Sequence, residues 1–171
     1  MYLLDSNIYI NFYDRYYKMN YFPTFWSTLP SILNSNVKIA EVILDENYQD
    51  PSFKEWLAQN YSPSLINHKE YSSEWGQVLA HVKSCGFYKD SALFSGRGWA
   101  NEKIADAWLI AIAKKLNLTI VTDEARNVNL NLINPSKNAK IPDVCDQLGI
   151  RCINMNQFFD EVSLRIYRLK Y

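Results

Sequence analysis

The sequence is poor in the residues and patterns that mark several protein classes. Its 171 residues include only five glycines, six prolines and two histidines, His68 and His81. It contains no apolar run long enough to span a membrane, so no membrane attachment is expected. Few glycines and prolines, together with 48% hydrophobic residues, argue against disorder. The length fits one folded domain over residues 1–171.

The cysteine content and the charge balance also limit the possible functions. Cys85, Cys145 and Cys152 are odd in number and form no CxxC pair, and no leader segment is evident, so we expect reduced thiols in a cytoplasmic protein. The histidines lack the spacing of a metal site. Eighteen basic residues balance 18 acidic ones. Because non-specific nucleic-acid binding usually needs excess positive charge, affinity for RNA would require a local patch or a metal ion.

The most informative stretch covers residues 104–124 and reads IADAWLIAIAKKLNLTIVTDE. Every residue of 104–113 except Asp106 is apolar, which predicts a buried helix that carries one acid near its start. Asn117 marks the expected helix end, and 118–121 is typical of a buried parallel strand. Thr122, Asp123 and Glu124 follow at the carboxyl end of that strand, where open α/β sheets place their active sites.

The N-terminus repeats this arrangement. Residues 2–4 form a minimal apolar strand, Asp5 follows it directly, and 8–17 has a helical pattern. The carboxyl ends of adjacent parallel strands lie at one edge of a sheet, so Asp5, Asp106 and the acids after residue 121 are expected to converge. Because close carboxylates repel one another, such a cluster predicts a divalent cation, and Mg²⁺ or Mn²⁺ suits an all-oxygen site.

The rest of the chain alternates predicted helices and short strands. A helix is expected from about Thr24, a strand over 37–40, and helices beyond residue 41 and over 53–59 and 70–84. A helix over 141–148 and a strand over 151–155 follow, and Asn156 is expected to cap a C-terminal helix that reaches Lys170. This order predicts an α/β fold, a three-layer domain with a central parallel β-sheet flanked by helices.

Two local features allow both a structural and a functional interpretation. Nine aromatic residues lie between Tyr9 and Trp26; core packing is favoured, and the alternative is a partner-binding or base-stacking surface. The SGRG segment at 95–98 is more typical of a plain turn than of a phosphate loop. Even so, Arg97 and Lys103 lie shortly before Asp106, where they could contact a phosphodiester.

Taken together, these segments resemble the PIN-domain superfamily of metal-dependent ribonucleases. The resemblance rests on YLLDSNIYI at 2–10, IAEVILDEN at 39–47 and the stretch at 104–124. It extends to IPDVCDQLGIRCINM at 141–155, which is similar to a PIN-like branch with a late IPDVC-type helix. VapC-like toxins of bacterial toxin–antitoxin pairs are relatives within the superfamily.

The resemblance implies the roles of individual residues. Matched position by position, the family's catalytic acids fall on Asp5, Glu46, Asp106 and Glu124, with Asp123 as an alternative to Glu124. Metal ligands would come from Asp5, Asp106, Asp123 and Glu124. Substrate contacts would come from Asn7 and Thr122, and from Arg97 and Lys103 on the basis of their position. Glu124 replaces the more usual Asp, and Asn47 replaces a common Leu.

The function that this resemblance implies is a Mg²⁺- or Mn²⁺-dependent endoribonuclease, the toxin of a type II toxin–antitoxin pair. Its partners would be RNA, a cognate antitoxin and a second copy of the chain. The alternative is a catalytically weak PIN-like binding or regulatory subunit. A phosphatase that begins with a strand and Asp needs a second Asp two residues later, where this chain has Asn7. A nucleotide-binding module would need a glycine-rich turn after the first strand.

Overall fold

A computed structural model describes residues 1–46 and 50–166. Within them, short strands form a four-stranded, all-parallel sheet in the order β2-β1-β3-β4. These strands are β1 (Tyr2–Leu4), β2 (Val37–Lys38), β3 (Thr119–Val121) and β4 (Cys152–Ile153). In register, Leu3 pairs with Ile120, and Val121 pairs with Ile153. The expected parallel sheet is therefore confirmed.

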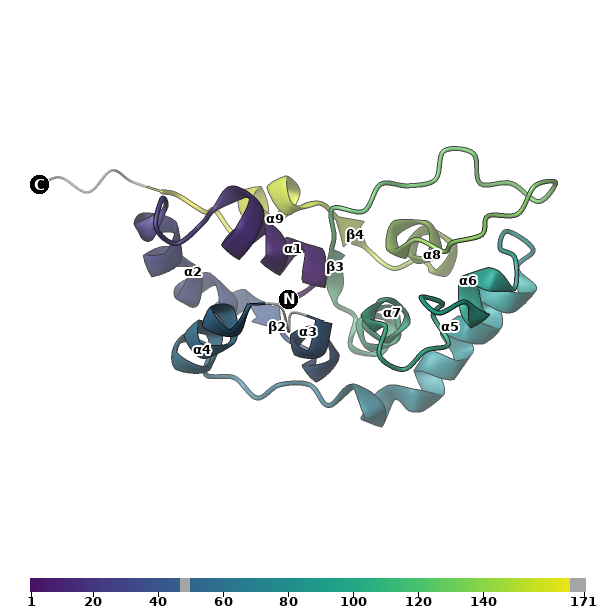
Figure 1. The fold of residues 1–171 in the computed structure, drawn as a ribbon, viewed down its shortest axis with the longest axis horizontal. Coiled ribbons are helices and arrows are strands. Elements are labelled where there is room, and N and C mark those ends of the chain that lie inside the picture. The colour runs from purple at the N-terminus through teal and green to yellow at the C-terminus, as the bar shows by residue number, and fades with distance from the viewer. Residues whose placement is uncertain (47–49, 167–171) are drawn as a thin grey trace, which may run out of the picture.

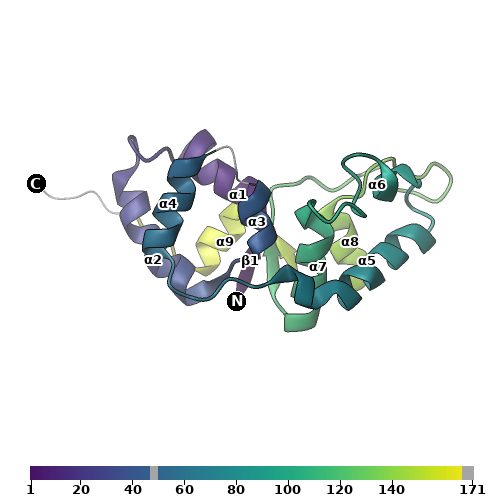
Figure 2. The same ribbon diagram turned by 60° about the horizontal axis from the view of Figure 1, so that its bottom comes forward.

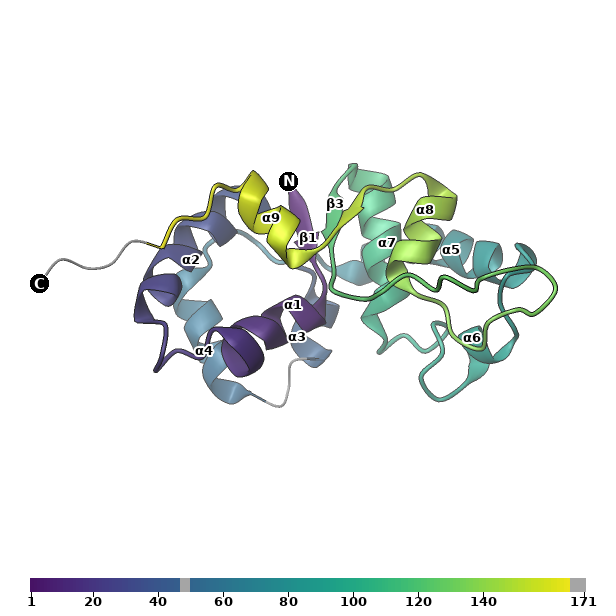
Figure 3. The same ribbon diagram turned by 90° about the horizontal axis from the view of Figure 1, so that it is seen from above.

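Helices cover both faces of this sheet and complete the three-layer α/β fold (Figures 1 and 3). In both views α1, α2, α4 and α9 lie on one side, and α5, α6, α7 and α8 lie on the other, while Figure 2 shows α3 near β1 between the two groups. The bounds are α1 (Ser6–Ile10), η1 (Asn11–Tyr16), α2 (Pro23–Asn36), α3 (Glu41–Glu46), α4 (Pro51–Asn60), η2 (His68–Tyr71), α5 (Ser72–Ser84), α6 (Ser91–Phe94), α7 (Ala105–Leu116), α8 (Ile141–Leu148) and α9 (Met155–Glu161).

Helix α7 is the most buried helix, as its sequence predicts. All its residues from Ala107 to Ala113 are buried, and it ends at Asn117, which adopts the left-handed conformation. Asn tolerates this conformation better than most residues, which explains why it ends the helix. Helix α8 has the bounds expected from its N-terminal proline and from Gly149, whose φ of 67° provides the left-handed turn at its end.

The N-terminal helix differs from its prediction. It begins at Ser6, directly behind Asp5, and from Asn11 it continues as the π-helix η1 to Tyr16. Most of the aromatics from Tyr9 to Trp26 pack into the core, and Phe12 contacts Phe25 at 5.3 Å between ring centroids. The core-packing interpretation is therefore confirmed for them. The exposed exceptions are Tyr16, Tyr21 and Phe22.

Two predicted boundaries are wrong. Helix α9 is capped by Asn154, whose side chain accepts a hydrogen bond from the backbone N–H of Gln157, and not by Asn156. It ends at Glu161, whereas the predicted end at Lys170 lies outside the described residues. No helix in the described ranges is long and apolar enough to cross a membrane.

Candidate active site

Asp5 stands at the centre of the site. It follows β1 at the carboxyl edge of the sheet, and its side chain is only 4% exposed. Its Oδ2 atom accepts hydrogen bonds from the Thr122 hydroxyl at 2.8 Å and from the Asn7 amide. The same Asn7 amide donates to Thr122 Oγ1 at 3.1 Å. Two strand ends, β1 and β3, thereby join through three polar side chains.

Asp106 lies in the first turn of α7 and receives one hydrogen bond. The indole Nε1 of Trp99 donates to its Oδ2 at 2.8 Å, and its Oδ1 has no hydrogen-bond donor within the described residues. Trp99 is placed by the turn at 95–98, in which a Cβ on Gly98 would overlap the carbonyl group of Leu93. The SGRG segment is thus a tight turn that positions Trp99, consistent with its structural interpretation.

Glu46 reaches the site from the end of α3. Its Oε2 accepts a hydrogen bond from the Ser6 hydroxyl at 2.8 Å, and its Oε1 accepts one from the backbone N–H of Ala105 at 2.8 Å. Ile104, the N-cap of α7, provides no side-chain cap, so Glu46 supplies it from another helix. The acid therefore links α1, α3 and α7.

Glu124 follows β3 and is tied to the start of α8. Its Oε1 accepts a hydrogen bond from Lys140 Nζ at 2.7 Å, and its Oε2 accepts one from the backbone N–H of Ile141 at 2.9 Å. Lys140 is 41% exposed at its side chain. Residues 125–139, which lie between Glu124 and Lys140 in the sequence, form a polar loop. These two hydrogen bonds therefore hold the two ends of that loop together.

Asp123 faces the opposite direction from Glu124. Its Oδ2 accepts a hydrogen bond from the Asn11 amide at 2.7 Å, and its Oδ1 accepts one from the backbone N–H of Met155 at 3.0 Å. These partners belong to η1 and α9. Among the two adjacent acids, it is the charge of Glu124 that raises the pKa of both Asp5 and Asp106.

Burial and mutual repulsion dominate the electrostatics of the site. Burial is the main reason that the pKa of Asp5 is raised to about 7; the hydrogen bond from Thr122 opposes this rise, and the charges of Glu124 and Glu46 add to it. Burial likewise raises the pKa of Asp106 well above its ordinary value, reinforced by the charges of Asp5, Glu124 and Glu46. The four acids matched by the family resemblance therefore lie close enough to repel one another.

The two upstream cations lie apart from these acids. Arg97 is exposed in the turn before α7 and forms no ion pair within 1–46 and 50–166. The Lys103 side chain lines a separate groove with Asp45 and His68. Lys140 is instead the cation at the site, because the charges of both Glu124 and Asp106 raise its pKa.

The donor set fits a hard divalent cation held by few protein ligands. Over the described ranges, no group of three or more His, Cys, Asp and Glu side chains is arranged to hold an ion. Asp5 Oδ1 accepts a 3.3 Å hydrogen bond from the Ser6 hydroxyl, and Asp106 Oδ1 accepts none from the described residues, whereas Glu46 and Glu124 use both oxygens in hydrogen bonds. Mg²⁺ commonly binds one or two carboxylates and completes its coordination with water and substrate phosphate.

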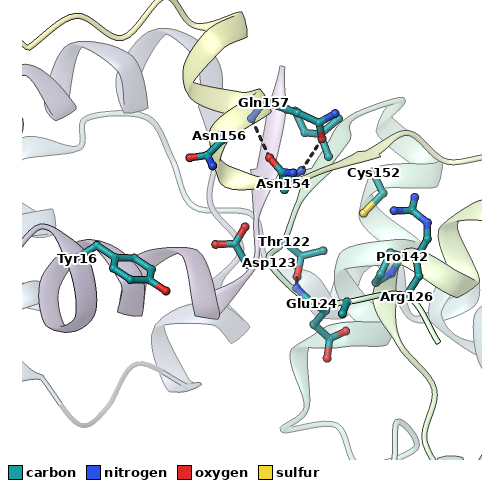
Figure 4. A pocket seen from close by; sticks show the side chains of 12 residues that line it. Tyr16, Thr122, Asp123, Glu124, Arg126, Pro142, Cys152, Asn154, Asn156 and Gln157 are labelled. Atoms are coloured by element: carbon teal, nitrogen blue, oxygen red, sulfur yellow. Dashed lines mark hydrogen bonds between the residues drawn. The ribbon is translucent and has the colours of Figure 1, made fainter. Parts of the chain in front are cut away.

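A pocket of about 480 Å³ adjoins the acids at the carboxyl ends of β3 and β4 (Figure 4). Thr122 and Glu124 belong both to its wall and to the acid cluster. The remaining wall comes from η1, α8 and α9 and from the segments between them. Asp5 and Asp106 do not line this pocket, so it lies beside the cluster and not over it.

Three residues of the site escape sequence reasoning. Ser6 and Trp99 hydrogen-bond the acids Glu46 and Asp106, and Lys140 pairs with Glu124. Ser6 could have been found as the polar neighbour of Asp5. Neither Trp99 nor Lys140 carries such a local signal, because a turn brings the first to Asp106 and the return of loop 125–139 brings the second to Glu124.

Comparison with protein-family models gives a match over nearly the whole chain. The family model described as a domain of unknown function (DUF4411) matches residues 2–166. A search of curated proteins found no significant match.

Proposed function

We propose that this chain, which belongs to the DUF4411 family, is a divalent-metal-dependent endoribonuclease. The observation that carries the proposal is the pair Asp5, at the end of β1, and Asp106, in the first turn of α7. Burial raises the pKa of both, and neither is paired with a Lys or Arg of the described residues. A bound cation would stabilise the ionised form of two such carboxylates. The resemblance to PIN-domain ribonucleases supports the same reaction.

The chain would hold the cation through Asp5 Oδ1 and Asp106 Oδ1. A divalent cation there would supply the charge that binds a phosphodiester and lowers the pKa of the attacking water. Glu46 and Glu124 hold the surrounding elements in place through Ser6, Ala105, Lys140 and Ile141. Thr122 and Asn7 fix the orientation of the Asp5 carboxylate.

Lys140 would contribute the positive charge that the neutral overall composition does not provide. It is partly exposed beside Glu124, and its pKa is raised, so it remains protonated at neutral pH. In the ion pair with Glu124 it can also face a substrate phosphate. Because Glu124 neutralises much of this charge, the divalent cation would still supply most of the attraction for RNA.

Cleavage of a mixed tRNA and mRNA pool tests the proposal. The wild type is expected to cut with Mn²⁺ or Mg²⁺ and not with EDTA, and Asp106→Asn is expected to lose cutting. Asp90→Asn is the matched control, because Asp90 is an exposed acid at the start of α6 that makes no side-chain cap. Cutting that persists in Asp106→Asn at the wild-type rate would remove Asp106 from the site.

We also propose that the chain is the toxin of a toxin–antitoxin pair in the cytoplasm. The exposed aromatics Tyr21 and Phe22 offer apolar surface to a partner protein. Expression of the chain alone should arrest bacterial growth, and co-expression with the neighbouring gene should restore growth and yield a complex. Normal growth with the active chain alone would count against this role.

The competing proposal is a binding or regulatory subunit with weak catalysis. It is favoured by Glu124, whose two oxygens are both occupied by Lys140 and the α8 N-terminus. A folded wild type that binds RNA but leaves it intact with either metal would support this alternative.

A further inference from the structure

The wall of the pocket beside the acids carries several side-chain amide groups whose N–H donors are unused within the described residues. The side chains of Asn156 and Tyr16 make no hydrogen bond to any described residue. Asn154 and Gln157 use their side-chain oxygens to accept each other's backbone N–H groups, as the dashed lines in Figure 4 show. Their amide NH₂ groups have no acceptor in the described part of the chain. The pocket therefore offers several amide groups to a ligand.

The charges in the pocket wall are already neutralised or engaged. Asp123 accepts hydrogen bonds through both oxygens, from Asn11 and Met155. Arg126 donates to both oxygens of Asp146, at 2.7 and 3.0 Å, and Glu124 is paired with Lys140. A free phosphate would meet no unpaired cation here. The wall instead suits a neutral polar group that exchanges hydrogen bonds with amides.

Tyr16 adds an aromatic face. It lies at the end of η1, its side chain is 57% exposed, and its ring contacts no other aromatic ring in the described ranges. In Figure 4 it stands on one side of the pocket, with Arg126 and Pro142 on the other. The neighbouring Tyr17 packs against the core instead, where its ring stacks on Phe25 at 4.4 Å between ring centroids. An exposed ring beside amide groups is the arrangement on which nucleobases stack.

We infer that this pocket binds one unpaired nucleobase of the RNA, stacked on Tyr16 and hydrogen-bonded by the Asn156, Asn154 and Gln157 amides. The volume of about 480 Å³ lies in the range of small-molecule sites. This inference rests on the proposed function, because the shared wall residues Thr122 and Glu124 place the base next to the phosphate at the acids. A base enters only when unpaired, so the site selects single-stranded RNA.

Titration with neutral nucleosides tests the base site separately from metal and catalysis. Adenosine, guanosine, cytidine and uridine are added to the isotope-labelled full chain in EDTA, and the side-chain NH₂ signals of Asn154, Asn156 and Gln157 are followed by NMR. At least one nucleoside should shift these signals. Tyr16→Ala should weaken its Kd at least about fivefold, the loss expected when a stacking partner is removed, whereas Tyr16→Phe should keep it.

Tyr21→Ala is the matched control, because Tyr21 is a 76% exposed tyrosine that does not line the pocket. Equal affinities for Tyr16→Ala and Tyr21→Ala, or no shift with any nucleoside, would overturn the base site. Failure of the nuclease proposal is seen separately: the wild type would then leave RNA uncut with Mn²⁺ while the nucleoside still binds through Tyr16.

Discussion

Glu46 caps a helix that is not its own: its Oε1 accepts a hydrogen bond from the backbone N–H of Ala105 at 2.8 Å. Through this contact α3 holds the start of α7, one residue before Asp106. An acid that the resemblance makes catalytic thus also has a structural role. The two roles can be separated by substitution.

We predict that Glu46→Gln folds with nearly wild-type stability, whereas Glu46→Ala loses about 1–2 kcal/mol, the usual cost of losing a helix cap. The glutamine oxygen can still accept from Ala105, but alanine cannot. Urea unfolding in EDTA measures both. Asp45→Ala, an exposed neighbour on α3, serves as the control. Equal loss in the glutamine and alanine variants would show that the charge, and not the hydrogen bond, stabilises α7.

Asp5 is predicted to make the metal-free protein less stable as pH rises. Its folded pKa is about 7 and its ordinary value is 3.8, so the stabilising proton is fully bound below pH 4 and is lost as pH rises towards 7. Above pH 7 in EDTA, the free energy of unfolding of Asp5→Asn should therefore exceed that of the wild type by about 1–3 kcal/mol. At pH 4 this advantage should vanish. Thermal melts across pH 4–8 provide the comparison, and a variant less stable at every pH would contradict the prediction.

Metal binding is predicted to restore the stability that the ionised, buried Asp5 carboxylate costs the folded protein. Mn²⁺ at about 100 times its Kd should stabilise the wild type by about 2.7 kcal/mol, because only the folded chain brings Asp5 and Asp106 together. Asp5→Asn and Asp106→Asn should each abolish most of the Mn²⁺-dependent rise in Tm. Glu41→Gln, an exposed acid on α3, should keep it. A full rise in Tm in both Asn variants would place the metal elsewhere.

Trp99→Phe is predicted to move the acid limb of RNA cleavage to higher pH. The Trp99 indole stabilises the Asp106 carboxylate and lowers its pKa, so its loss raises a pKa that burial and the acids Asp5, Glu124 and Glu46 already raise. Trp108→Phe is matched to it, since Trp108 is also buried but donates its indole hydrogen bond to the carbonyl group of Glu102. The pH dependence of cleavage by Trp108→Phe should match that of the wild type. Parallel shifts in both variants would point to a general packing effect.

The thiols are predicted to react unequally. A hydrogen bond with Cys145 and the nearby Arg126 lower the pKa of Cys152, which lines the pocket, whereas that bond and burial raise the pKa of Cys145. At neutral pH iodoacetamide should label Cys152 at least about tenfold faster than Cys145. Peptide mapping by mass spectrometry follows both sites. Faster labelling of Cys145 would contradict the packing of α8 against β4.

Local sequence patterns were enough to predict the parallel sheet, the buried helix α7 and the positions of Asp5, Asp106 and Glu124 at strand ends or a helix start. These features follow from local periodicity and from the rule that parallel strands end at one edge. Local patterns also place α8, because its proline and Gly149 mark both ends.

Which side chains face one another depends on how the helices and strands pack together. This packing turns Asp123 towards Asn11 and Glu124 towards Lys140, although the two acids are adjacent in sequence. The cation beside the acids is Lys140, which follows the long loop 125–139, whereas Arg97 and Lys103 were expected there from the sequence. The pocket around Tyr16 arises from η1, α8 and α9, which are distant in the chain. Such contacts depend on packing between elements, and short-range sequence patterns carry no information about them.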